Sequence, residues 1–199
     1  MASPLDSFIP TCDARERFQL RVRAPAALLY QTAAEFDFQS LSLVRAIFWL
    51  RTRLLGSKPG PPTAPSQGFL AGAPSLGWGV LREEPGRLFI AGAHCQPWLP
   101  DVVFHPLTAV SFGPFAAPSQ VKIAWTLEVE PLDESHSTLA TETRAAATDA
   151  EARRLFRSYW RWARFGVHSI RWLLLPAIRR QAQERYHSTH PAPTNPDGT

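Results

Sequence analysis

Apolar and polar residues alternate along three stretches of the chain, which is typical of strands that bury one face. In the first stretch, Phe18, Leu20 and Val22 alternate with polar residues. The other two cover residues 121–129 and 138–146, with turn-forming residues between them. The pattern therefore predicts three strands, of which the last two pair antiparallel.

A β-hairpin is predicted between the first strand and these two. Residues 78–83 and 87–93 flank a Glu-Pro-Gly turn at 84–86, in which proline presets the turn and glycine accepts a positive φ. The stretch that follows contains five prolines, so any strand in it is expected to be short, at 102–104 or 110–112.

Helical spacing predicts two short helices after the first strand. Leu29, Ala33 and Phe36 recur every three or four residues behind Pro25, which suits the start of a helix. A second helix is expected from Ser42 to the residue before Gly56, and a proline-rich loop over 57–68 follows it.

The longest amphipathic pattern predicts a final helix from a capping box at Thr148 and Glu151 to Tyr186. Pro176 lies inside it and predicts a kink. The apolar positions of this helix are Ala152, Leu155, Phe156, Tyr159, Trp160, Ala163, Val167, Ile170, Leu174 and Ile178.

Together these elements predict one α+β domain, a helix-grip fold in which a curved antiparallel β-sheet wraps around a long C-terminal helix. A length of 199 residues, 45% of them hydrophobic, is sufficient for one domain with a real core. The domain is expected to cover residues 15–186, with a flexible tail at 1–14 and a disordered tail at 187–199.

Charge and composition narrow the function only slightly. The formal net charge is +4, and the chain has neither a signal-peptide pattern nor an apolar run long enough for a membrane span, so we expect a cytoplasmic protein with reduced cysteines. Arginines crowd the final helix, which predicts a solvated outer face or, as an alternative, a weak contact with an anionic membrane or protein. No specific nucleic-acid binding is expected, because no recognised motif accompanies them. These arginines are Arg153, Arg154, Arg157, Arg161, Arg164, Arg171, Arg179, Arg180 and Arg185.

The order of elements resembles that of the SRPBCC proteins, the START and Bet v 1-like superfamily with polyketide cyclase-like members. The string Thr141-Glu142-Thr143-Arg144 before the final helix and Phe156-Arg157-Ser158-Tyr159-Trp160 within it are similar to those of an uncharacterised bacterial branch. The likeness covers about residues 15 to 185. It implies a cavity between sheet and helix that holds an apolar ligand, such as a lipid, sterol or polyketide, and it implies no catalytic residue.

Aromatic residues are the candidate ligand-binding side chains, because they would supply a large apolar lining with a few polar groups. An ordinary filled core is the alternative reading. The candidates are Trp78, Phe89, Trp98, Trp125, Phe156, Tyr159 and Trp160.

The remaining polar residues give weaker candidates. Glu142 and Arg144 are expected on the solvated convex face of the sheet, where ion pairs contribute little. His94 and His105 do not match a metal-ligand spacing, so neither a metal nor another cofactor is predicted. A cyclase or hydrolase that uses His94 or Tyr159 as acid-base is the enzymatic alternative. Oligomeric state and catalysis stay open.

Overall fold

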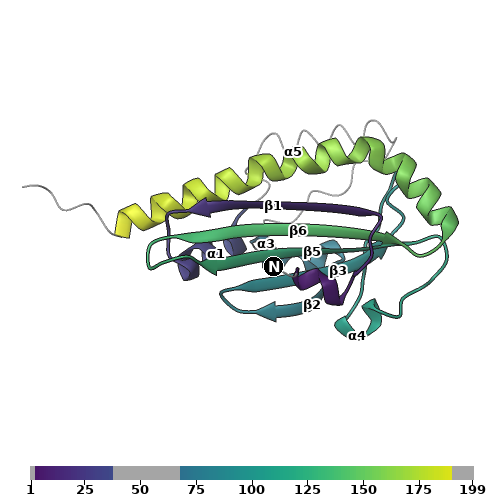
Figure 1. The fold of residues 1–199 in the computed structure, drawn as a ribbon, viewed down its shortest axis with the longest axis horizontal. Helices are drawn as coiled ribbons and strands as arrows, with labels where there is room; N and C mark the ends of the chain where they lie inside the picture. The colour runs from purple at the N-terminus through teal and green to yellow at the C-terminus, as the bar shows by residue number, and fades with distance from the viewer. Residues whose placement is uncertain (1–2, 38–67, 190–199) are drawn as a thin grey trace, which may run out of the picture.

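The computed structural model describes residues 3–37 and 68–189 and confirms the α+β helix-grip prediction (Figure 1). The described helices and strands are η1 (Pro4–Ser7), β1 (Ala14–Val22), α1 (Ala26–Glu35), α3 (Phe69–Gly72), η3 (Pro74–Leu76), β2 (Gly79–Glu84), β3 (Leu88–Cys95), β4 (His105–Pro106), α4 (Ala109–Phe112), β5 (Val121–Pro131), β6 (Ser137–Ala147) and α5 (Ala150–Thr189). The helix predicted from Ser42 and the loop predicted before Gly68 lie outside the described residues.

The sheet is antiparallel throughout its described pairs and has the strand order β1-β6-β5-β3-β2, with the two-residue β4 beside β3. The predicted hairpin is β2–β3, and Gly86 in its turn has a φ of 81°. In β1, the predicted inner residues Phe18 and Leu20 are half-buried and alternate with exposed polar residues. Successive strand residues point to opposite faces, so each strand contributes one row of side chains to the side that faces α5.

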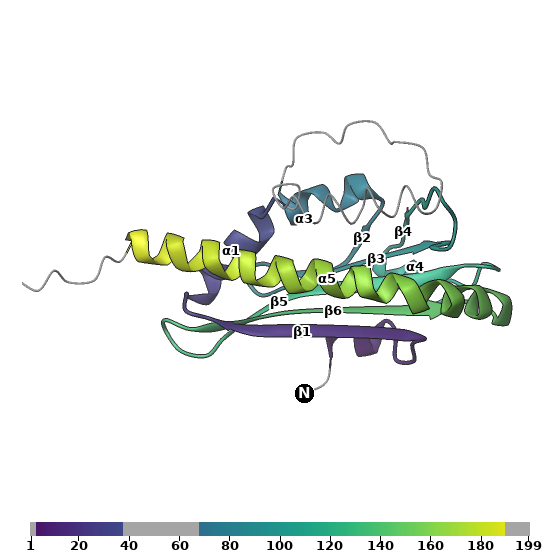
Figure 2. The same cartoon turned by 90° about the horizontal axis from the view of Figure 1, so that it is seen from above.

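Helix α5 lies along the concave face of the sheet, roughly parallel to β1 and β6 (Figures 1 and 2). Its N-terminal end is held by Phe156, which is 1% exposed and packs with Ala14, Val121 and Ala145. Its C-terminal half is held by the buried residues Leu174, Leu175, Ile178 and Ala182, which belong to the core that α1 completes. No residue of α5 between Phe156 and Leu174 is buried.

The start of α5 differs from the predicted capping box. The Thr148 hydroxyl instead joins the strand ends, because it accepts a hydrogen bond from Gln120 N at 3.1 Å and donates one to Gln120 O at 3.0 Å. Asp149 caps the helix, and its Oδ1 accepts from Ala152 N at 2.7 Å. The helix continues through Pro176 to Thr189, three residues into the predicted tail, and later residues lie outside the described part.

The short strands expected at 102–104 and 110–112 are wrong. Residues 109–112 form a turn of helix, α4, because Thr108 and Ser111 make a capping box: the Thr108 hydroxyl accepts from Ser111 N at 3.2 Å, and Ser111 Oγ accepts from Thr108 N at 2.9 Å. Phe112 at its end is fully buried against the convex face of the sheet.

The flexible tail expected at residues 1–14 is also corrected from Ser3 onward. Leu5 is 0% exposed and Ile9 is 2% exposed, and both pack on the convex face with Ile90 and Ala124. These apolar residues have no strand or helix period, which is why the pattern alone gave no structure for them. The segment covers the face of the sheet that α5 leaves open.

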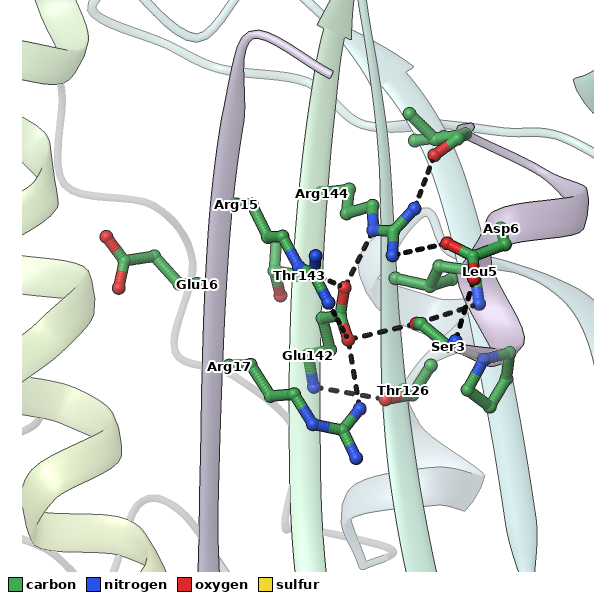
Figure 3. A network of polar contacts seen from close by, with 12 residues as sticks. Ser3, Leu5, Asp6, Arg15, Glu16, Arg17, Thr126, Glu142, Thr143 and Arg144 are labelled. Carbon is green, nitrogen blue, oxygen red and sulfur yellow. Dashed lines mark hydrogen bonds and ion pairs between the residues drawn. The ribbon is translucent and has the colours of Figure 1, made fainter. Parts of the chain in front are cut away.

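A buried ionic network fixes this segment to the sheet (Figure 3). The Glu142 carboxylate is fully buried and accepts hydrogen bonds from Ser3 Oγ at 2.9 Å, Arg17 Nη1 at 2.9 Å and Arg144 Nε at 2.7 Å. Burial acts to raise the pKa of Glu142, but these hydrogen bonds outweigh it and hold the pKa below its ordinary value of 4.5.

Arg144 completes the network on the side of the N-terminal segment. It is 3% exposed, donates from Nη1 to Ile9 O at 2.7 Å and pairs through Nη2 with Asp6 Oδ1 at 2.7 Å. The sequence placed Glu142 and Arg144 on the correct face but expected weak, solvated ion pairs there. They are buried because residues 3–9 cover them.

We expect truncation of Ile178 to destabilise the protein much more than the same truncation of Ile170. Ile178 is 2% exposed and tightly packed, so Ile178→Ala should cost roughly 2–5 kcal/mol in the free energy of unfolding. Ile170 is half-buried in the middle of α5, so Ile170→Ala should cost only about 1 kcal/mol. Urea unfolding measures both, and equal costs would show that the middle of α5 is packed like its ends.

We expect Glu142→Gln to cost roughly 3–5 kcal/mol, because it removes the buried charge at the centre of the network and leaves the buried Arg144 with only the half-exposed Asp6 as an ion-pair partner. Since folding lowers the Glu142 pKa, its contribution is present above pH 4.5 and is lost as the pH falls below that value. The wild type should therefore lose more stability than the variant between pH 5 and pH 3. Glu151→Gln is the matched control, since Glu151 pairs with Arg154 on the exposed surface of α5. Parallel pH profiles for wild type and Glu142→Gln would contradict the assignment.

Candidate ligand-binding cavity

A cavity of about 1190 Å³ lies between the concave face of the sheet and α5. Its floor is formed by inward-facing strand residues, among them Trp125, Leu139 and Thr141. Its roof is the middle of α5, from Leu155 to Ile178. Most of this roof is the stretch between Phe156 and Leu174, in which α5 has no buried side chain.

An aromatic cluster around Trp125 forms part of the cavity wall. The Trp125 ring stacks on Phe69 with ring centroids 4.8 Å apart, meets Trp78 edge-on at 6.0 Å and lies 5.5 Å from Phe89. Such pairs add to the stability that apolar burial alone provides. They fix the orientation of the indole that forms much of this wall.

Two glycines beside Trp78 allow close approach to the backbone on either side of β4. A Cβ on Gly77 would come within 2.2 Å of Phe104 O, and a Cβ on Gly79 would come within 2.1 Å of Leu107 O. Only glycine allows this close approach of two backbone segments. Phe104 consequently stacks on Trp78, with ring centroids 4.6 Å apart, and joins the cavity wall.

A second aromatic cluster lies in the cavity wall near the start of α5. Phe156 and Trp160, one turn apart on α5, stack with centroids 5.7 Å apart, and Tyr159 lies 6.5 Å from Phe156. Trp98, from the loop after β3, packs against the same cluster. The cavity wall therefore contains two aromatic clusters and is mostly apolar.

Six of the seven aromatic residues predicted from the sequence line this cavity. Phe89 is the exception, since it is 3% exposed and packs behind Trp125 in the core. Phe69 and Phe104 line the cavity but were missed. Their sequence neighbourhoods, a short helix after a loop and a proline-rich stretch, carry no period from which an inner face could be read.

Few polar side chains reach the cavity. Thr141 and Thr143 on β6, Ser158 and Tyr159 on α5, and Arg171 are part of its wall. The sequence counted Arg171 with the solvated arginines, which is wrong. Arg171 comes four residues after Val167 and three before Leu174, and this spacing places it on the inner side of the helix with them.

The other chemical candidates lie outside the cavity. His94 is on the convex side of β3, where its Nδ1 is 3.0 Å from Gln120 Oε1 and its ring stacks on His105 and Phe115. His168 packs edge-on against Phe18. Within the described part of the chain, no group of three His, Cys, Asp or Glu side chains is arranged to hold a metal ion.

The outer face of α5 carries both ion pairs and exposed aromatic rings. Arg153 pairs with Asp13 at 2.8 Å, and Arg185 pairs with Glu35 at 3.0 Å. Trp172 is 71% exposed there, and Trp162, which also borders the cavity, is 74% exposed. Across residues 3–37 and 68–189, none of the helices has the length and apolarity needed to cross a membrane.

The fold and the cavity together define a helix-grip domain with an apolar interior space. No protein-family model and no curated protein matches the sequence. Among solved structures, the chain is similar to a Thermobifida fusca protein determined by solution NMR, with 18% identity, coverage of 88% of this chain and 95% of that chain, and a TM-score of 0.38.

Two further solved structures show comparable likeness. A conserved protein from Geobacillus kaustophilus has 9% identity, coverage of 87% and 98% of the two chains and a TM-score of 0.38. The Zhui aromatase/cyclase from Streptomyces sp. R1128 has 11% identity, coverage of 90% and 99% and a TM-score of 0.34. These similarities are too remote to support an argument. The fold assignment therefore rests on the helices and strands of this chain.

Proposed function

We propose that this protein binds an apolar or aromatic small molecule in the cavity between the sheet and α5. The observation that carries the proposal is the cavity itself, about 1190 Å³ of space with mostly apolar walls. Ligand-binding pockets typically measure roughly 300–1,000 Å³ and have apolar walls with a few polar groups. The proposed SRPBCC membership, which rests on the order of elements and the two sequence strings, agrees with this reading.

The physical reason for binding is that the cavity walls are mostly apolar. Side chains that face an unfilled space lack dispersion contacts on that side, and apolar walls do not hold ordered water well. A ligand that fills the space supplies these contacts and removes its own apolar surface from water. Because only the folded chain has the cavity, binding should also raise the melting temperature.

A way into the cavity is available at the middle of α5. Trp162 and Phe165 line the cavity and are also 74% and 59% exposed. A side chain that borders both the interior space and the solvent marks the place where the two meet. An apolar ligand that passes there would meet aromatic surface first.

The proposed contact residues are the six aromatic residues of the walls that the sequence singled out, with Phe89 as a supporting residue behind Trp125. They are Trp78, Trp98, Trp125, Phe156, Tyr159 and Trp160.

Two alternatives have weaker support. A cyclase or hydrolase would rely on Tyr159, since His94 lies on the other face of the sheet. Contact of α5 with an anionic surface has the exposed Trp172 in its favour. However, several of the helix arginines already have carboxylate partners, as Arg153 and Arg185 do.

We expect the neutral, solvent-sensitive dye Nile red to bind with micromolar affinity and to gain fluorescence. Ala163→Phe should weaken this binding at least tenfold, because Ala163 lines the cavity and the added ring would occupy it. Arg164→Phe adds the same ring one position further, at an exposed residue outside the cavity wall, and should leave the affinity unchanged.

The melting temperature of each variant serves as the check on folding. If Ala163→Phe remains folded and binds Nile red as tightly as the wild type, the dye does not use this cavity. If the wild type gives no fluorescence gain with Nile red, the proposed function is wrong.

A further inference from the structure

One cation, Arg171, stands in the wall of the otherwise apolar cavity. Its guanidinium lies over the pair Glu16 and Thr143, which face each other across β1 and β6. Nη1 donates to the Glu16 carbonyl oxygen at 3.3 Å, and Nη2 donates to the Thr143 hydroxyl. The guanidinium carbon is 5.6 Å from the centre of the Phe18 ring.

These contacts leave the charge of Arg171 largely uncompensated. They use two of the five N–H donors of the guanidinium. Among the described residues, no carboxylate oxygen lies within 4 Å of its nitrogens. By contrast, Arg153, Arg154, Arg157, Arg180 and Arg185 on the same helix each have a carboxylate partner within that distance.

The surroundings of Arg171 disfavour the charged form of its side chain. Burial lowers the pKa of Arg171 to about 10, and the charges of Glu16 and Glu142 offset only part of this effect. Glu142 belongs to the network on the opposite face, whereas the Glu16 side chain points away from that network (Figure 3). A cation in an apolar wall attracts an anion more strongly than a solvated one does, because little water competes.

We propose that the ligand of this cavity is an amphipathic monoanion, an apolar body with one carboxylate, and that Arg171 binds the carboxylate. This inference rests on the proposed function and specifies its ligand class. A guanidinium presents its N–H groups as a planar fork that matches the two oxygens of a carboxylate. The apolar body would then lie against the aromatic side chains of the cavity wall.

The charge of Glu16 should weaken the binding of an anion at Arg171. Its side chain is half-buried on the inner face of β1, and its negative charge raises the pKa of Arg171 without a salt bridge between the two. A carboxylate at Arg171 would experience repulsion from Glu16. Removal of that charge should therefore strengthen the binding of an anionic ligand, which is opposite to the effect of removing Arg171.

The test compares two probes with the same apolar body, pyrenebutyric acid and pyrenebutanol, by fluorescence titration at pH 7. The wild type should bind the acid about tenfold or more tightly than the alcohol, as expected for a charge-assisted hydrogen bond in a site with little water. Arg171→Gln should abolish this preference while the affinity for the alcohol stays within about twofold. The alcohol thus reports whether the cavity of the variant is intact.

Two conservative variants complete the set. Arg171→Lys keeps the charge without the planar fork and should retain part of the preference for the acid. Glu16→Gln should widen that preference. If Arg171→Gln does not fold, these two variants still decide the question, because both predictions concern the ratio of the two affinities.

The outcomes separate this inference from the proposed function. Equal wild-type affinities for acid and alcohol, or a preference that Arg171→Gln leaves intact, would overturn the assignment of Arg171 and leave the cavity as a binding site. A failure of the wild type to bind either probe would count against the proposed function itself.

Discussion

Helix α5 buries side chains near its two ends, and none of its residues between Phe156 and Leu174 is buried. In this middle stretch it contacts the edge of the sheet through His168, which packs on Phe18, and through Arg171, which donates hydrogen bonds to β1 and β6. Phe156 is buried toward one end of the helix, and Leu175 and Ile178 are buried toward the other, so these two parts of α5 hold it against the concave face. The cavity lies along this middle stretch, between the helix and the inward-facing residues of the strands.

The opposite face of the sheet is closed by a different kind of interaction. Residues 3–9 cover it, and the buried Glu142 and Arg144 tie that segment to the strands. A fully paired and hydrogen-bonded network of this kind specifies one arrangement of its partners, whatever its net stability. The two faces of the sheet therefore differ. The convex face is covered by residues 3–9, whereas the concave face borders the cavity in which we propose that a ligand binds.

The stretches with a strand or helix period predicted the fold. Features that produce no such period in the sequence were missed. Alternation identified β1, β5 and β6, and helical spacing identified α5, because each of these elements has one apolar face. Period alone could not show that residues 3–9 cover Glu142, since burial by a distant segment leaves no local pattern. Arg171 was misread for a related reason: its spacing matched the inner side of α5, but its charge was taken to decide its environment.

A ligand could bind inside the cavity or on the exposed aromatic rings of α5, and the tryptophans distinguish these two places. Two-dimensional NMR of ¹⁵N-labelled protein shows the indole N–H groups of the tryptophans, which single Trp→Phe variants assign. Titration with Nile red should shift the signals of Trp125 and Trp160 in the cavity walls and leave that of the outward-facing Trp172 in place. Shifts confined to Trp172, with Trp125 and Trp160 unmoved, would place the ligand on the outer surface and contradict the account.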